Sequence, residues 1–171
     1  TWVFMEKDGT VGVGIDDFLQ HVTGPISKIK MKEPGEKVKK GEPFLTLIQD
    51  GKQLNIKAPI SGTIKSQNKG LVSNISLLMN SPYQEGWIYV IEPSNWFRDI
   101  QFLIMSQGYK EWLKMEFLHL KDFLAIALKG QNANEYQVVL QDGGEIKNGI
   151  LRDMKPEIWE DFQTHFLDSS K

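Results

Sequence analysis

Cysteine is absent from the 171 residues, which excludes disulfides, thiol catalysis and thiolate metal ligands. No apolar run approaches the roughly 20 residues that a membrane helix needs, so we expect no membrane insertion within this segment. The formal net charge of −2 supplies no basic surplus for phosphates, and we expect no nucleic-acid binding. These absences favour a cytoplasmic protein. The sequence begins at Thr1 rather than Met, so we expect a piece of a longer chain, and a preceding anchor or signal stays open.

Signatures of catalysis are also missing. The three histidines, His21, His119 and His165, are far apart in the sequence and lack the spacing of a metal site. No Gly-x-Ser-x-Gly element marks a serine nucleophile. Gly12 and Gly14 lack the third glycine of a dinucleotide-binding loop and are better explained by close strand packing. We therefore predict no catalytic residues, no metal and no autonomous enzyme.

The spacing of apolar residues along the chain changes near Pro93. From Trp2 to Pro93, short alternating apolar segments predict strands, interrupted by one short helix with Asp16 as its N-cap and Gly24 near its end. The pair Asp50-Gly51 between two apolar strands predicts a tight hairpin of type I′, because both central residues of that turn need positive φ.

After Pro93 the apolar residues recur at helical spacing, first from Trp96 to Met105 and then from Tyr109 to Leu128. A second hairpin is predicted from Gln137–Leu140 and Glu145–Leu151, followed by an amphipathic helix over Pro156–Leu167. We expect most of the abundant aromatic residues in this part to be core residues, because a short region needs large side chains to bury enough area. They are Trp96, Phe97, Trp112, Phe117, Phe123, Trp159, Phe162 and Phe166.

Several motifs occur in a fixed order along the first two thirds of the chain. They are Val38-Lys39-Lys40-Gly41-Glu42-Pro43-Phe44, Pro59-Ile60-Ser61-Gly62, Asn80-Ser81-Pro82-Tyr83-Gln84-Glu85-Gly86-Trp87, Ile91-Glu92-Pro93-Ser94 and Gly108-Tyr109-Lys110-Glu111-Trp112-Leu113. In sequence and spacing they resemble the H protein of the glycine cleavage system, a lipoyl carrier of the biotinyl/lipoyl hammerhead family. The resemblance implies a mainly β fold, a flattened β-sandwich (barrel-sandwich hybrid).

The resemblance also suggests a division of the chain. Residues 1–113 would form the carrier-type domain with its C-terminal helix, and residues 114–171 an α+β extension with a helix–hairpin–helix layout and no recognised motif. We expect this C-terminal module either to pack against the sandwich or to bind a partner specific to this subgroup of proteins.

The position of the lipoyl lysine departs from the family pattern. In the family this lysine comes seven residues after the Phe of Gly-Glu-Pro-Phe and eight before the Pro of Pro-x-Ser-Gly. Both counts end on Gly51 here, and Lys52 is the nearest lysine, one position later. A shift of one residue re-aims a side chain, so we expect lipoyl-attaching enzymes to reject Lys52 or to act on it slowly.

Two hypotheses follow. In the first, the protein carries no cofactor and acts as a scaffold or adaptor for other proteins of a multienzyme or redox complex. In the alternative, lipoate on Lys52 makes it a carrier for glycine cleavage or a related one-carbon or redox complex, in which the arm rather than the protein holds the chemistry. A biotin carrier is less favoured, because the hairpin lacks that family's Met-Lys-Met pattern.

A lysine-rich stretch offers a candidate docking patch for an acidic partner. It contains Lys28, Lys30, Lys32, Lys37, Lys39 and Lys40. The competing interpretation, which we favour, is a solvated edge strand that lysines protect against aggregation.

Overall fold

Two antiparallel sheets form the body of the protein in the computed structural model, which describes residues 1–128 and 146–168. The five-stranded sheet has the order β1-β2-β8-β7-β4, and the three-stranded sheet the order β3-β5-β6. The strands are β1 (Trp2–Met5), β2 (Val11–Gly14), β3 (Lys28–Met31), β4 (Lys37–Val38), β5 (Pro43–Gln49), β6 (Lys52–Lys57), β7 (Gly62–Gln67) and β8 (Trp87–Pro93). This is the flattened β-sandwich that the sequence predicts.

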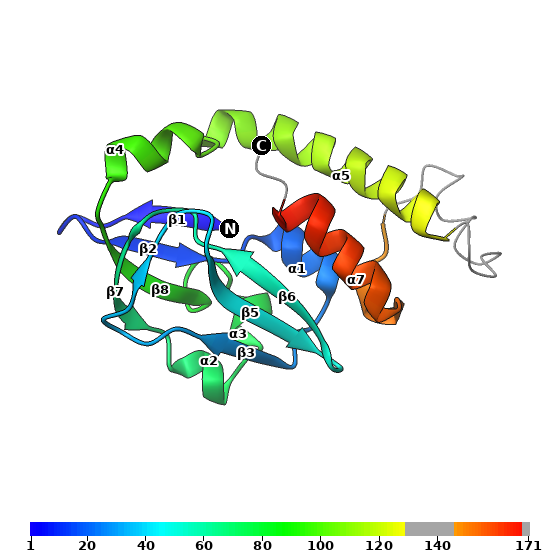
Figure 1. Cartoon of the computed structure of the whole chain (residues 1–171), viewed down its shortest axis with the longest axis horizontal. Coiled ribbons are helices and arrows are strands. Elements are labelled where there is room, and N and C mark those ends of the chain that lie inside the picture. The colour runs from blue at the N-terminus through cyan, green and yellow to red at the C-terminus, as the bar shows by residue number, and fades with distance from the viewer. Residues whose placement is uncertain (129–145, 169–171) are drawn as a thin grey trace.

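The long helix α5 passes over α1 and α7 on one side of the sandwich, and the short helices α2 and α3 lie on the opposite side, near β3 (Figure 1). The α-helices are α1 (Asp17–Thr23), α2 (Gly70–Ser73), α3 (Leu77–Asn80), α4 (Trp96–Asp99), α5 (Ser106–Leu128) and α7 (Pro156–Phe162). The 3-10 turns η1 (Ile100–Phe102) and η2 (Ile150–Asp153) and the π-helical η3 (Gln163–Asp168) complete the described elements. None of the described helices combines the length and the apolar content needed to cross a membrane.

The core between the two sheets comes from the alternating apolar residues of their strands. Leu54 and Ile56 of β6 are buried while Gln53 and Asn55, which alternate with them, are exposed, as a half-buried strand requires. Tyr89 of β8 crosses the core, where its hydroxyl donates to the Phe44 carbonyl of β5 at 2.8 Å. Burial raises the pKa of Tyr89 to about 12, so this link between the sheets stays protonated at neutral pH.

Local predictions for the body are confirmed. Asp16 caps α1 through a bond that its carboxylate accepts from the Leu19 amide, and Gly24 ends the helix with φ of 70°. The predicted Asp50-Gly51 hairpin joins β5 and β6, with φ of 50° and 80° at its two central residues. The left-handed conformation at both positions is what a type I′ turn needs.

The C-terminal part corrects two predictions. The helical stretch predicted over Trp96–Met105 is interrupted, because Leu103 is extended (φ −91°, ψ 138°) and ends η1. The strand predicted at Glu145–Leu151 is wrong for the described residues: Gly149 has φ of 72° and starts η2. Its amide bonds to the His21 carbonyl rather than to a neighbouring strand. The other strand of that hairpin, Gln137–Leu140, lies outside the described residues.

Aromatic side chains join α5 to the elements beneath it. Phe18 of α1 meets Trp112 and Phe117 edge-on, with ring centroids 6.0 and 5.1 Å away. Phe123 contacts Phe162 and Phe166 in the same way. Most of the predicted core aromatics are buried or pack against the core, whereas Phe97 is 82% exposed. Because α5 runs without a break through residue 113, the predicted domain boundary falls inside one helix, and the division at 113 stays a prediction.

Candidate functional site

The tip of the β5–β6 hairpin is the place where the sequence pattern expects a lipoyl lysine. Gly51 occupies that position, and a Cβ built on it would meet no atom within 4 Å. The position is therefore open to solvent, but its φ of 80° disfavours every residue other than glycine. The hairpin thus presents a free position without a side chain that could be modified.

Lys52, one residue later, points toward the C-terminal part of the chain. Its ammonium donates to the carbonyl oxygen of Arg152 and, at 3.1 Å, to that of Met154. The same nitrogen lies 5.0 Å from the centre of the Trp159 ring. Two carbonyls and an aromatic face are suitable partners for a cation, so the amine that could bear a lipoyl group already has intramolecular partners.

Residues 146–168, which we name the C-terminal segment, also cover the outer edge of β6. The Gln163 side chain accepts a bond from the Asn55 amide at 2.8 Å and donates to the Asn55 carbonyl at 3.1 Å. At the far end of the strand, Lys57 pairs with Asp168 at 3.1 Å. The segment therefore contacts β6 near its beginning, middle and end.

The other end of the C-terminal segment is fixed on α1. The Gly149 amide donates to the His21 carbonyl at 2.7 Å, and His21 Nε2 lies 2.9 Å from the Ile146 carbonyl oxygen. Gly24 and Gly149 come into backbone contact: a Cβ on Gly24 would lie 2.8 Å from the Gly149 Cα, and one on Gly149 would lie 3.2 Å from the Gly24 Cα. Only glycines allow so close an approach.

The histidines make separate local contacts. His165 Nδ1 lies 2.8 Å from the Asp161 carbonyl oxygen, and His119 is near Glu116 of the same helix. Within residues 1–128 and 146–168, no group of three His, Asp or Glu side chains could hold a metal ion.

The six candidate docking lysines divide between the two sheets. Lys28 and Lys30 are exposed on β3, an edge strand of the three-stranded sheet, and Lys37 is exposed on β4, an edge strand of the other. Lys32 is paired with Glu36 at 3.2 Å. These positions at sheet edges agree with lysines that protect edge strands.

Lys39 and Lys40 follow β4. Lys39 is exposed, whereas the Lys40 amine donates to the Asp99 carbonyl at 3.4 Å and lies 3.8 Å from the centre of the Phe102 ring. Burial lowers the pKa of Lys40 from its ordinary value, with Asp99 opposing the shift and Arg98 adding to it. Lys40 is therefore partly engaged in holding the chain that leaves the sandwich.

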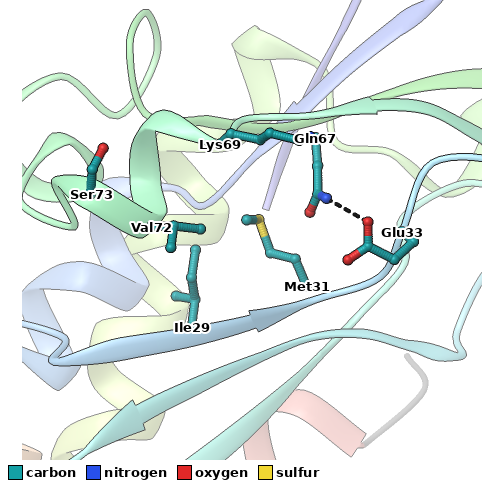
Figure 2. A pocket seen from close by; sticks show the side chains of 7 residues that line it. All are labelled: Ile29, Met31, Glu33, Gln67, Lys69, Val72 and Ser73. Atoms are coloured by element: carbon teal, nitrogen blue, oxygen red, sulfur yellow. Dashed lines mark hydrogen bonds between the residues drawn. The ribbon is translucent and has the colours of Figure 1, made fainter.

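A hollow of about 500 Å³ lies away from the hairpin tip, between β3 and α2. Figure 2 shows Met31 and Ile29 reaching into it from β3 and Gln67 turned toward Glu33, to which the Gln67 amide donates at 2.8 Å. Val72 and Lys69 close its other side. This lining combines apolar side chains with a carboxylate already bonded to Gln67, and it contains neither Gly51 nor Lys52.

Comparisons with known proteins agree with the motifs and the sandwich. A family profile described as Glycine cleavage H-protein matches residues 1–116. This chain belongs to the glycine cleavage H-protein family. "Glycine cleavage system H protein 2" of Aquifex aeolicus is 37% identical over 122 residues, covering 71% of this chain and 74% of that protein. The H protein of Thermus thermophilus is 34% identical over 115 residues, covering 67% of this chain and 88% of its own.

A solved structure gives the same assignment for the fold. The crystal structure of a glycine cleavage system H protein from Mycobacterium marinum has a TM-score of 0.51 at 28% identity, covering 54% of this chain and 77% of that one. H proteins are non-catalytic carriers, and this member of the family is accordingly a carrier-type protein and not an enzyme. The C-terminal segment lies beyond the residues that the family profile matches.

Sequence reasoning predicted the hairpin that carries Gly51 and Lys52, but it missed the groups that receive the Lys52 amine; the roles of the two residues stay predictions. The acceptors are the backbone carbonyls of Arg152 and Met154, and any residue type supplies a carbonyl. The role of Gln163 could not be found either, because a single exposed amide in an amphipathic helix carries no signal. Gly149 was predicted to lie within a strand, and its contact with Gly24 depends on the tertiary fold.

Proposed function

We propose that this H-protein-family chain works without lipoate, as a non-catalytic scaffold or adaptor for proteins of a multienzyme or redox complex. The observation that carries the proposal is the hairpin tip. The family's lysine position is Gly51, in a left-handed conformation that lysine adopts only at a cost of about 1–2 kcal/mol. A chain that carried an arm there would need another residue and another turn.

The contacts of Lys52 support the same conclusion. A swinging arm requires an amine that projects into solvent, whereas the Lys52 amine is bonded to two carbonyls and lies against the Trp159 ring. Without an arm, the chain keeps the family's sandwich as a surface on which partners can dock. The exposed lysines Lys28, Lys30, Lys37 and Lys39 remain a predicted surface for an acidic partner.

The second candidate is a lipoyl carrier with its arm on Lys52, for glycine cleavage or a related one-carbon or redox complex. The observation that favours it is the family itself, because the relatives from Aquifex aeolicus and Thermus thermophilus are glycine cleavage H proteins. Lys52 is only one position from the family's site, so an attaching enzyme that tolerates this shift would make the chain a carrier.

The intact mass of the protein from its native host decides between the two. We expect an unmodified mass, and peptide mapping across Phe44–Pro59 is expected to find Lys52 unacylated. A lipoyl protein of the same cells that is fully modified serves as the control for lipoate supply. A lipoyl group found on Lys52 would overturn the proposed function and make the protein a carrier. Lys52→Arg would then abolish carrier activity, because arginine keeps the cation but cannot be lipoylated.

A further inference from the structure

We infer that the C-terminal segment is a built-in cover for the carrier hairpin, and that Lys52 is the cation that holds it closed. The cover shields the Lys52 amine from acyl transfer, so acylation at this site requires the segment to open first. This inference rests on the proposed function for its account of why the hairpin bears no lipoate. The arrangement of the cover itself is argued from contacts that are independent of that function.

The first argument is that the groups around the Lys52 ammonium are suited to bind a cation. A carbonyl of η2 and one directly after it, those of Arg152 and Met154, converge on the ammonium. Carbonyls at the end of a helical turn carry partial negative charge and favour a cation. The Trp159 ring adds its negative face at 5.0 Å. Lys52 is thus bound in the way that a separate cationic ligand would be.

The second argument is that this site is rigid. Trp159 is 1% exposed, and its indole N–H donates to the Leu151 carbonyl at 2.7 Å. The bond ties η2 to α7, so the carbonyls of Arg152 and Met154 are held in place by the buried face of α7. A fixed site loses little conformational entropy when it binds the amine.

The third argument is that the C-terminal segment satisfies backbone groups at the outer edge of β6. As the outer strand of the three-stranded sheet, β6 would otherwise present unpaired backbone groups to solvent. The Gln163 amide satisfies both backbone groups of Asn55, which is the pattern of bonds that one residue of a neighbouring strand would supply. The segment therefore takes the place of an additional strand at this position.

The contacts of the Lys52 amine determine whether it can be acylated. In acylation the neutral amine attacks an activated carbonyl carbon, a C–N bond forms, the leaving group departs and the nitrogen gives up a proton. The nitrogen must therefore be free of its partners and within reach of the acyl donor. Bonded to two carbonyls beside Trp159, Lys52 meets neither condition while the cover is closed.

Trace acetylation of the full chain with the N-hydroxysuccinimide ester of acetate tests the inference, with peptide mass spectrometry reporting each lysine. Lys65, whose side chain is 52% exposed, is the reference. We expect Lys52 to react at least about tenfold more slowly, because opening must break two hydrogen bonds to a charged donor. Equal rates for Lys52 and Lys65 in the unaltered protein would overturn the inference, and this comparison requires no variant.

Gly149→Ala should open the cover from its other end. The added Cβ would crowd the Gly24 Cα at 3.2 Å, and φ is 72°. We expect acetylation of Lys52 to rise severalfold, together with that of Lys57, whose amine is paired with Asp168 in the same segment. Gly9→Ala is the matched control: its φ is 85°, but its Cβ would meet no atom within 4 Å. Gly9→Ala therefore has a similar cost from positive φ, but the added Cβ does not contact the C-terminal segment.

The outcomes separate this inference from the proposed function. If Lys52 is protected and its reactivity rises in Gly149→Ala but not in Gly9→Ala, the cover is established. If Gly149→Ala leaves a protected Lys52 unchanged, the segment does not control access and the inference is wrong. Lipoate found on Lys52 in native protein would overturn the proposed function, whereas the acetylation rates would still report whether the segment controls that amine.

Discussion

The β-sandwich and the C-terminal segment are both well packed, yet they are held in different ways. The sandwich has backbone ladders between neighbouring strands and a core shared by the two sheets, bridged by Tyr89. The C-terminal segment has a buried aromatic face, with Trp159 1% and Phe162 0% exposed. Its hydrogen bonds to β6, however, are made by single side chains, those of Lys52, Lys57 and Gln163.

The difference bears on how each region opens. A strand of the sandwich cannot leave without breaking a ladder and exposing the common core. Opening of the C-terminal segment breaks side-chain hydrogen bonds to β6 rather than a backbone ladder, although its buried residues belong to the same hydrophobic core as the strands. We expect the segment to open at lower free energy than the global transition.

The largest expected effect is the loss of a buried ring from the core of the sandwich. Phe44, 2% exposed, packs on Tyr89 in the sandwich with ring centroids 5.3 Å apart. We expect Phe44→Ala to lower the global free energy of unfolding by about 3–5 kcal/mol, measured by urea denaturation. Phe97→Ala, at a side chain that is 82% exposed, is the surface control and should change stability by less than about 0.5 kcal/mol.

Phe162→Ala is the counterpart in the C-terminal segment. It removes a ring stacked on Phe166 at 4.7 Å. We expect hydrogen exchange to accelerate in the segment and at the outer edge of β6, while the β2–β8 ladder keeps its protection. Equal acceleration in that ladder would mean that segment and sandwich unfold as one unit, and the comparison would fail.

Gly51→Lys restores a lysine at the family's position and tests whether an amine there is shielded as that of Lys52 is. We expect a loss of about 1–2 kcal/mol in the free energy of unfolding, because lysine must adopt a φ of 80°. The new side chain would start in open space, so its amine should acetylate as fast as that of Lys65. Gly51→Ala is the control, with the same backbone cost and no amine.

The outcome of Gly51→Lys shows whether the cover protects only the Lys52 amine or the whole hairpin tip. If residue 51 reacts like Lys65 while Lys52 stays slow in the same molecule, the cover protects one amine and not the whole tip. Slow acetylation at both positions would contradict the open geometry at residue 51 and extend the shielded region to the entire hairpin.

The body of the protein could be predicted from sequence because its signals are local. Asp50-Gly51 encodes a turn by its φ preferences, and Asp16 and Gly24 encode both ends of a short helix. The assignment of the family's lysine position to residue 51 rests on motif spacing and stays a prediction. Each of these inferences needs only residues that are close together along the chain.

The C-terminal segment could not be predicted in the same way, because its decisive contacts join residues about 100 positions apart. Lys52 meets Met154, and Asn55 meets Gln163. The prediction of a strand at Glu145–Leu151 failed because Gly149 follows the surface of α1 instead of pairing with a strand. Its apolar residues Ile150 and Leu151 are buried as expected of a strand, but within a 3-10 turn.

The smallest expected effect concerns the end of the cover at Asp168. A hydrogen bond from Gln163 is the largest cause that holds the pKa of Asp168 below its ordinary value of 3.8; burial opposes it, and the bond and charge of Lys57 lower the pKa further. A carboxyl whose pKa is lower in the folded protein stabilises it above pH 3.8, and this contribution disappears as the pH falls through the lower folded value. The pair is partly exposed, so Asp168→Asn should cost less than about 1 kcal/mol at pH 7. Carboxyl NMR titration should show the pKa of Asp168 rising in Gln163→Ala, because the Gln163 bond is the largest single cause of its lowering. An unchanged pKa in that variant would mean that Lys57, and not the amide that covers Asn55, fixes this end of the segment.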